Sequence, residues 1–207
     1  MVHLRVLEAA LELQQFCRSQ GWRFCFIGGL AVQRWGRPRV TSDADLTLLT
    51  NFTDEERIVG DLARAFSLRR DDGIEFALHN RVLLLAHPNG TPLDIGLGAL
   101  PFENRSVERS SPHIFSAGFE LVVCSAEDLL VHKAFASRAQ DWVDVENILA
   151  ANWGGLDLGL VRSELRPLAE LKESPDILDQ LEARIRKLAR SRYFSSGGRP
   201  PWETTPP

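Results

Sequence analysis

A strand that ends in two glycines and leads directly into a helix is the feature that most constrains the fold. The apolar run at residues 23–27 is typical of a buried strand, and Gly28 and Gly29 separate it from a short helical segment at 30–35. Because glycine has no Cβ, a ligand can approach the backbone N–H groups of this turn closely, and the start of a helix favours negative charge. The turn therefore predicts a phosphate cradle. An ordinary strand–helix turn is the alternative.

An acidic pair follows on the next predicted strand, residues 40–49. Asp43 and Asp45 are two residues apart, so both side chains would project from the same face of that strand. Two carboxylates placed in this way repel each other unless a cation lies between them, and Mg²⁺ binds one or two carboxylates together with phosphate oxygens and water. The pair therefore indicates a magnesium site. The alternative is a solvated acidic pair at a strand edge.

A third acidic residue lies on a predicted β-hairpin. Asn89 and Gly90 form a tight-turn signal between a strand at 81–87 and a return strand at 92–97. Asp94 lies within the return strand between apolar neighbours, where a carboxylate is costly to bury without a partner. Beside the acidic pair it would complete a three-carboxylate cluster for two metal ions roughly 4 Å apart, and it would be the candidate base. The alternative is an outward-facing carboxylate.

The order of the predicted elements indicates an α+β fold with a mixed sheet, because mixed helices and strands are followed by helices alone. Capping-box patterns at residues 53–56 and 125–128 mark two helix starts. We expect an α/β core at residues 1–124, a helical region at 125–194 and a disordered tail at 195–207. Helices are predicted at residues 4–17, 30–35, 53–66, 125–137, 141–151, 158–172 and 175–192, and a further strand at 119–124.

Composition narrows the class of protein. The chain has 207 residues and a net charge of −4, which argues against a protein that coats nucleic acid indiscriminately. Cys17, Cys25 and Cys124 have apolar neighbours and no ligand-like spacing, so we expect buried thiols in a reducing cytoplasm. No apolar run approaches the ~18 residues of a membrane span, and the first residues lack the features of a signal peptide. We therefore expect a cytoplasmic protein without a membrane partner.

The combination of a glycine pair, an Asp-x-Asp motif and a later lone aspartate resembles the pattern of the nucleotidyltransferase superfamily. Over residues 24–149 the chain is similar to bacterial minimal nucleotidyltransferases and to the AbiE-type toxins of abortive-infection and toxin–antitoxin systems. The resemblance continues in Lys133, Arg138, Asp141 and Asp144. Spacing alone places the two aspartates on one helix face, with the lysine and arginine on the preceding helix. Without the resemblance, surface salt bridges between these two helices would be the preferred explanation.

The resemblance implies the polymerase-β-like nucleotidyltransferase fold, Mg²⁺ or Mn²⁺ as cofactor and a nucleoside triphosphate (NTP) as substrate. The implied metal ligands are Asp43, Asp45 and Asp94. The implied catalytic residues are these three aspartates and Lys133, which would contact the nucleotide. The other implied nucleotide-binding residues are Gly28, Gly29, Arg39, Thr41, Arg138 and Asp141. Ala44 departs from the larger β-branched residue that is more common in the family, but it removes no ligand.

The leading hypothesis is an enzyme that transfers a nucleoside monophosphate from an NTP to a hydroxyl and releases pyrophosphate. The resemblance allows a tRNA 3′ end, a side chain of a partner toxin or antitoxin, or a small molecule such as an antibiotic as the acceptor. The alternative is a non-catalytic nucleotide-binding regulatory or partner-binding protein of the same fold. Five basic residues between Arg184 and Arg192 would contact RNA phosphates or form a solvated helix face.

Overall fold

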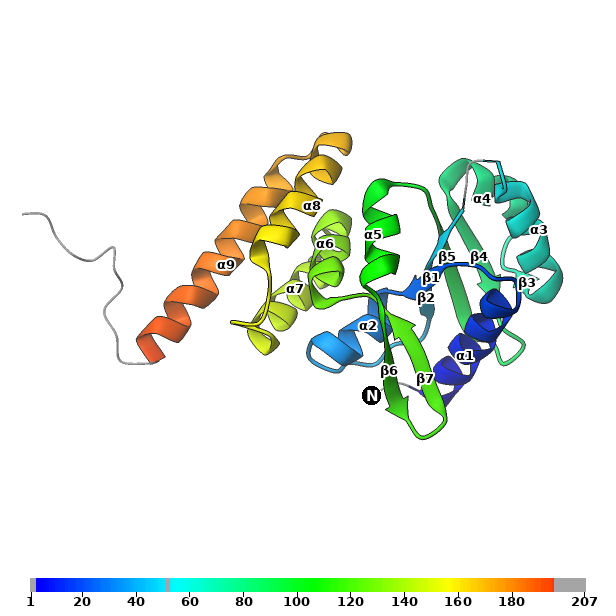
Figure 1. Cartoon of the computed structure of the whole chain (residues 1–207), viewed down its shortest axis with the longest axis horizontal. Coiled ribbons are helices and arrows are strands. Elements are labelled where there is room, and N and C mark those ends of the chain that lie inside the picture. Colours follow the sequence, from blue (N-terminus) through cyan, green and yellow to red (C-terminus); the bar gives the residue numbers. More distant parts are fainter. Residues whose placement is uncertain (1–2, 51–52, 196–207) are drawn as a thin grey trace, which may run out of the picture.

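A mixed sheet forms the centre of the protein (Figure 1). The computed structural model describes residues 3–50 and 53–195, and within these residues the sheet has seven strands. The strands are β1 (Phe24–Phe26), β2 (Ala44–Leu49), β3 (Ser67–Leu68), β4 (Val82–Ala86), β5 (Pro92–Gly98), β6 (Ser111–Ser116) and β7 (Phe119–Val123). Their order is β3-β4-β5-β2-β1-β7-β6. β2 runs parallel to β5 and β1 parallel to β7, whereas the other neighbouring pairs are antiparallel.

Nine helices of the described part of the chain surround and extend this sheet. Five lie among the strands in the sequence: α1 (Leu4–Ser19), α2 (Gly28–Trp35), α3 (Glu55–Ala65), α4 (Gly73–Asn80) and α5 (Pro101–Arg109). Four follow the last strand: α6 (Ala126–Ala136), α7 (Ala139–Ala151), α8 (Leu158–Leu171) and α9 (Asp176–Ser195). This order confirms the predicted α+β class and the helical second part. Among the described residues, every helix is too short or too polar to span a membrane.

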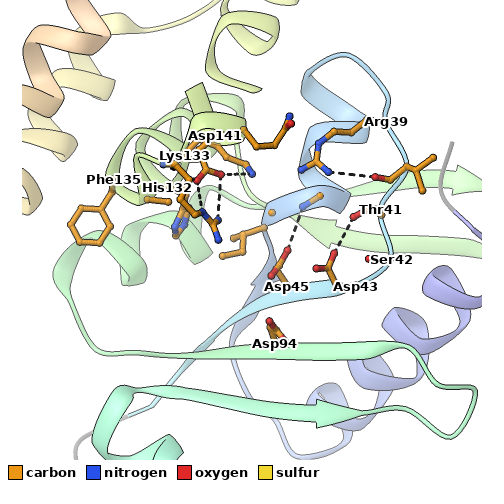
Figure 2. Close-up of a pocket in the computed structure, with 17 residues that line it drawn as sticks. Arg39, Thr41, Ser42, Asp43, Asp45, Asp94, His132, Lys133, Phe135 and Asp141 are labelled. Atoms are coloured by element: carbon orange, nitrogen blue, oxygen red, sulfur yellow. Dashed lines mark hydrogen bonds and ion pairs between the residues drawn. The ribbon is translucent and has the colours of Figure 1, made fainter. Parts of the chain in front are cut away.

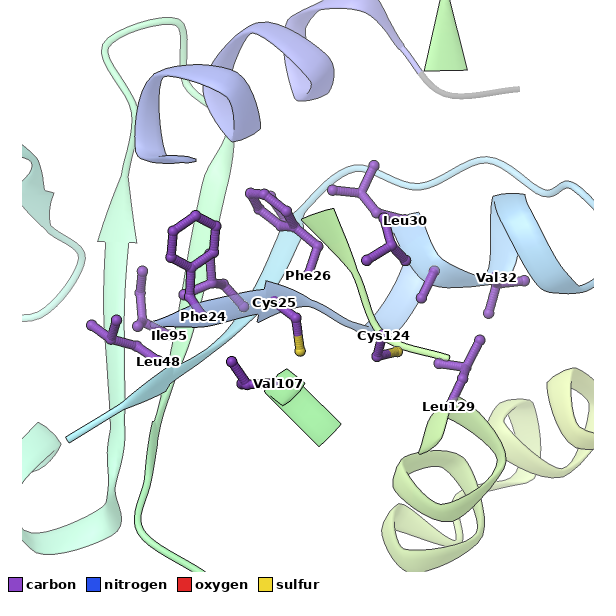
Figure 3. Packing of buried hydrophobic residues seen from close by; sticks show 14 of the residues in the cluster. Phe24, Cys25, Phe26, Leu30, Val32, Leu48, Ile95, Val107, Cys124 and Leu129 are labelled. Atoms are coloured by element: carbon purple, nitrogen blue, oxygen red, sulfur yellow. The ribbon is translucent and has the colours of Figure 1, made fainter. Parts of the chain in front are cut away.

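The central strand β1 is buried on both of its faces. Figure 3 shows Phe24 and Phe26 pointing toward α1, while Cys25 points to the other face, where it meets Val107 of α5. Successive strand residues alternate between faces, so helices on both sides require an apolar residue at every position. The three cysteines are free and buried, as predicted. Burial raises the pKa of Cys25 to about 12, which keeps its thiol neutral and unreactive.

The structure confirms most of the predicted elements and adds four. The hairpin of β4 and β5 forms around a turn in which Gly90 adopts a φ of 86°. Helices α4 and α5 and strands β3 and β6 were not predicted. β6 alternates half-buried and exposed residues at the edge of the sheet, so it lacks the apolar run of a central strand. Of the tail predicted at residues 195–207, Ser195 is the last residue of α9, and residues 196–207 lie outside the described part, so the disorder of the tail stays a prediction.

One of the two predicted capping boxes is wrong. Ser125 Oγ accepts a hydrogen bond from the backbone N–H of Asp128 at 3.0 Å, which confirms the cap of α6. Helix α3 instead begins at Glu55, and its N-cap residue Asp54 makes no capping hydrogen bond with its side chain. With Asp54 as the N-cap residue, the third helical position is Arg57 instead of Glu56, so the carboxylate that the predicted box needs is out of place.

Two arginines of α5 connect the sheet layer to the helical part. Arg109 donates from Nε and Nη2 to the two carboxylate oxygens of Asp128 on α6, at 3.0 and 2.5 Å. Its Nη1 lies 3.0 Å from Oε1 of Glu164 on α8, and Arg105 also donates to this Oε1, at 2.8 Å. Both carboxylates are buried, and a buried charge without a partner is strongly destabilising. Arg109 therefore holds three helices together.

We predict that Arg109→Met lowers the free energy of unfolding by about 3 kcal/mol, because it leaves the Asp128 carboxylate buried without its cation. Arg105→Met is the matched control. It removes the same charge, but Arg105 is more exposed and Glu164 keeps Arg109, so a loss of about 1 kcal/mol or less is expected. Urea denaturation followed by tryptophan fluorescence measures both values. Equal losses would contradict the special role of Arg109.

Candidate active site

One cavity of about 570 Å³ contains every residue that the sequence predicted for the site (Figure 2). It opens between the ends of β2 and β5, the start of α2, and helices α6 and α7. The ten predicted residues that line it are Gly28, Gly29, Arg39, Thr41, Asp43, Asp45, Asp94, Lys133, Arg138 and Asp141. The fold therefore brings together groups from five separate segments of the chain. The individual roles of these residues stay predictions.

Strand pairing places two of the three aspartates side by side. In the parallel pair of β2 and β5, Asp45 is the register partner of Asp94. Cross-strand partners lie on the same face of a sheet, so both carboxylates face the cavity, as Figure 2 shows. The outward-facing alternative for Asp94 is therefore wrong. Because the register joins residues far apart in the chain, this proximity depends on the whole sheet rather than on a local motif.

Asp43 is not part of a strand, contrary to the prediction. β2 begins one residue later, at Ala44, and Asp43 lies in a bend. Continuing the register of β2 would place Asp43 opposite Pro92, whose nitrogen has no hydrogen to donate to the ladder. Thr41 Oγ1 donates to Asp43 Oδ1 at 3.2 Å, and the carboxylate faces the cavity beside Asp45. A turn thus positions the side chain that was expected on a strand.

The glycine pair is required by space as well as by conformation. Gly28 adopts a φ of +56°, and a Cβ at this residue would lie 1.9 Å from Oδ2 of Asp45. A Cβ on Gly29 would lie 1.9 Å from Thr41 Oγ1. The Gly29 backbone N–H points at Asp45 Oδ2 over 3.4 Å. The start of α2 and the acidic wall are therefore in direct contact, which only glycine permits.

Burial and neighbouring negative charges make Asp45 and Asp94 harder to ionise. Burial raises the pKa of Asp45 to about 6, and the negative charges of Asp43 and Asp94 contribute to this rise, against smaller opposing effects of the Gly29 N–H and Lys133. Burial also raises the pKa of Asp94, while the nearby Arg69 guanidinium lowers it and Asp43 raises it. Such mutual repulsion is relieved by a cation placed between the carboxylates.

The donors at this wall fit Mg²⁺ in their chemistry, since all three side chains offer carboxylate oxygens. Each carboxylate already has its own partner in the protein: Thr41 for Asp43, the Gly29 N–H for Asp45, and Arg69 for Asp94. Among the described residues, no three Asp, Glu, His or Cys side chains are placed to hold one ion together. The ligand types are therefore present, and the predicted three-carboxylate metal cluster stays a prediction.

A second group of charges lies on the opposite wall of the cavity. Lys133 Nζ lies 3.0 Å from Asp141 Oδ1 and 2.9 Å from Asp144 Oδ2. The two aspartates therefore share one face of α7, as predicted. Arg39 donates to both oxygens of Asp144, at 3.2 and 3.1 Å. Because both aspartates and the lysine are buried, the alternative of surface salt bridges is wrong.

Arg138 is not on the same helix as Lys133, contrary to the prediction. α6 ends at Ala136, because Ser137 adopts a left-handed conformation with φ 59°, and Arg138 is the N-cap residue of α7. Its Nε donates to Asp141 Oδ2 at 2.6 Å. Although burial raises the pKa of Asp141, hydrogen bonds from Arg138 and Lys133 lower it overall. Asp141 therefore lies between two cations and carries a full negative charge.

These contacts rank the cations by their access to a ligand. The Lys133 side chain is 8% exposed, whereas that of Arg138 is 77% exposed. A charged group entering the cavity would therefore meet Arg138 first, and Lys133 would act mainly by fixing α6 against α7. The predicted helix end near residue 137 agrees with the structure, but this order of access depends on how deeply each side chain is buried between α6 and α7, which the sequence does not indicate.

Two features of the site were missed or misread. Arg69, which pairs with Asp94, had no sequence signal, because the two-residue strand β3 before it is too short to recognise. His132 was not predicted for the site, and its ring packs edge-on against Phe102 at 4.9 Å between centroids. Burial lowers the pKa of His132 to about 4, so the ring is neutral. It lines the cavity together with Phe135, which lies at the end remote from the aspartates (Figure 2).

Comparison with protein families tests the family resemblance that the motifs indicated. The family model described as "Nucleotidyl transferase AbiEii toxin, Type IV TA system" matches residues 13–196. The chain belongs to this AbiEii family. The match extends beyond residues 24–149, over which the motifs resemble the family, and includes the helical part of the structure.

A solved structure of a nucleotidyltransferase-like protein shares the fold of this AbiEii-family protein. An antigenic nucleotidyltransferase-like protein from Paracoccidioides brasiliensis has a TM-score of 0.50 at 15% identity, and the match covers 88% of this chain and 94% of that chain. The antibiotic-resistance factor ANT(2'')-Ia has a TM-score of 0.44 at 14% identity, with coverage of 92% and 94%. The first match confirms the predicted nucleotidyltransferase fold. No curated protein matches the sequence.

We predict that Asp45→Asn stabilises the metal-free protein at pH 8 by about 2 kcal/mol, because it removes a charge that the fold disfavours. The pKa of Asp45 is raised from 3.8 to about 6 in the folded protein, so the cost of its charge appears as the pH rises through this window. At pH 4 the folded protein holds this carboxyl neutral, and the two proteins should be about equally stable. Urea denaturation in EDTA at both pH values measures this, and a variant less stable than wild type at pH 8 would refute the interpretation.

Proposed function

We propose that this AbiEii-family protein is a nucleotidyltransferase that uses Mg²⁺ or Mn²⁺ to transfer a nucleoside monophosphate from an NTP to a hydroxyl acceptor. The observation that supports it most is the register of β2 and β5, which sets Asp45 beside Asp94 next to the start of α2. Carboxylates beside a helix N-terminus at one cavity suit a metal-bound triphosphate. We also propose a functional division at residue 124, with the metal ligands in the α/β core and Lys133 and Arg138 in the helical region.

Asp43, Asp45 and Asp94 would hold the metal, which when bound neutralises the triphosphate and polarises the reacting phosphoryl group. The N–H groups of Gly28 and Gly29 would orient phosphate oxygens at the start of α2. The Asp94 carboxylate would accept the proton of the acceptor hydroxyl. The hydroxyl oxygen would bond to the α-phosphorus of the NTP, and pyrophosphate would leave. Most of the rate would come from such positioning and charge neutralisation.

Other residues of the cavity would bind the rest of the triphosphate. Arg39 and Arg138 lie at its wall with N–H donors suited to phosphate oxygens, and Thr41 adds a hydroxyl beside Gly29. Lys133 and Asp141 would fix this wall rather than contact the nucleotide strongly, since both side chains are buried, whereas those of Arg39 and Arg138 are 35% and 77% exposed. We therefore place the strongest phosphate contacts on the arginines.

The acceptor and the biological partner belong to the proposal as well. The family description names a toxin of a toxin–antitoxin system, so we favour a cognate antitoxin as the partner and tRNA or a protein hydroxyl as the acceptor. The buried, free cysteines support a reducing cytoplasm as the place of action. A small molecule is the third class of acceptor for the enzyme.

A non-catalytic nucleotide-binding role is the second candidate. It is favoured by one observation, namely that each of the three carboxylates is paired with a group of the protein instead of converging on a shared position. Under this hypothesis the cavity binds a nucleotide without turnover, and nucleotide affinity should be insensitive to Asp94→Ala.

We predict that the wild-type protein transfers label from an α-phosphate-labelled NTP to an acceptor, and that Asp43→Asn lowers this transfer about a hundredfold or more. Each NTP is incubated with Mg²⁺ and total tRNA, and products are separated by electrophoresis. Asp71→Asn is the control, because Asp71 is an exposed carboxylate outside the cavity. Label on tRNA identifies an RNA acceptor, and label on protein identifies a protein acceptor. Equal transfer by wild type and Asp43→Asn would exclude the proposed metal site.

A further inference from the structure

Arg69 is joined to the acidic wall by the same strand register that aligns the aspartates. It follows β3, and its backbone N–H donates to the carbonyl of Leu84 on β4 at 3.1 Å. Leu84 is the register partner of Asp94 on β5, and Asp94 is the partner of Asp45 on β2. These four residues therefore form one row across the sheet, with side chains on a common face. The Arg69 side chain crosses Leu84 and pairs with the Asp94 carboxylate.

The charges of this row explain why the arginine is there. Asp94 lies beside Asp45 and close to Asp43, so without a cation three negative groups would share one wall. Lys133, Arg39 and Arg138 are committed to Asp141 and Asp144 on the opposite wall. The Arg69 guanidinium supplies a positive charge at the position where the proposed metal site needs one.

The ion pair of Arg69 and Asp94 is also weak enough for a metal ion to displace the arginine. Both side chains are partly exposed, at 31% for Arg69 and 34% for Asp94, and partly exposed ion pairs are weak because water screens them. A divalent cation carries twice the charge of the guanidinium and can bind carboxylate oxygens of more than one residue at once. It can therefore displace the arginine, whose long side chain has solvent to move into.

We propose that Arg69 is an intrinsic counter-ion of the metal site, holding Asp94 in the metal-free protein and competing with the divalent cation for it. The inference rests on the proposed function, since it assumes that Asp94 is a metal ligand. Arg69 thereby sets the concentration of free metal at which the site fills. It is a positioning residue, because it acts on the metal only through Asp94.

The neighbouring Arg70 provides a matched control. Arg70 pairs with Asp72 at 2.8 Å, in an exposed ion pair that does not involve the acidic wall. Arg70→Gln therefore removes the same charge from nearly the same place without freeing Asp94. Arg69→Lys retains the charge at the critical position and should behave as wild type.

The experiment measures binding of Mn²⁺ alone, by calorimetry and by electron paramagnetic resonance of the free ion, at about 0.15 M ionic strength. Arg69→Gln is expected to bind Mn²⁺ about threefold to tenfold more tightly than wild type, as expected for the loss of one weak competing ion pair. Arg70→Gln should stay within about twofold of wild type, where long-range charge effects are screened. This pattern, with wild-type affinity in Arg69→Lys, supports the proposal.

Unchanged or weaker Mn²⁺ binding by Arg69→Gln overturns the proposal, and so does equal tightening in Arg69→Gln and Arg70→Gln. Asp94→Asn separates this failure from failure of the proposed function. If Asp94→Asn weakens Mn²⁺ binding while Arg69→Gln leaves it unchanged, Asp94 is a metal ligand and only the counter-ion role is wrong. If Asp94→Asn has no effect, or if wild type binds no Mn²⁺, the metal site itself is wrong and both proposals fall.

Discussion

The repulsion among three carboxylates on one wall is the constraint on which the rest of the site depends. Asp45 and Asp94 are forced together by the pairing of two parallel strands, and Asp43 is added by the bend before β2. Such an arrangement persists only because each carboxylate has a donor: the Thr41 hydroxyl, the Gly29 N–H or the Arg69 guanidinium. The free energy that it costs to assemble these charges is offset when a cation binds among them.

The opposite wall of the cavity also brings like charges together, but there the charges are positive. Three cations, Lys133, Arg39 and Arg138, meet there, and the buried carboxylates of Asp141 and Asp144 keep them together. The cavity thus has an acidic wall from the α/β core and a wall of paired cations on α6, α7 and the loop before β2. Because Arg109 fixes α5 to α6 and α8, the separation of these walls is held by a further buried network. A metal-bound triphosphate, which carries both signs of charge, suits such a divided cavity.

Sequence reasoning found the parts of the site that depend on short segments. The glycine pair, the acidic pair and the hairpin of Asp94 each carry a local signal, and all their residues line the cavity. It failed where position depends on tertiary context. Asp43 was assigned to a strand because alternation continues through it, although Pro92 removes its partner. Arg138 was placed on the helix of Lys133, but the left-handed Ser137 ends that helix and makes Arg138 the N-cap residue of α7. The position of Arg69 beside Asp94 could not be predicted from the sequence, because it follows from a strand register that spans four chain segments.

Two of these misses have a common physical origin, and it bears on how the site works. Arg138 and Arg69 are cations whose position is set by pairing with a carboxylate. The short side chain of an aspartate lies close to the backbone, so local sequence largely determines its position. A long cationic side chain can reach any of several carboxylates that the tertiary fold brings near it. In the protein without bound metal, these arginines pair with carboxylates of the protein itself. Under the proposed function, binding of a metal and a triphosphate would therefore be an exchange of ionic partners, in which each ligand charge must outcompete a charge that the protein already supplies.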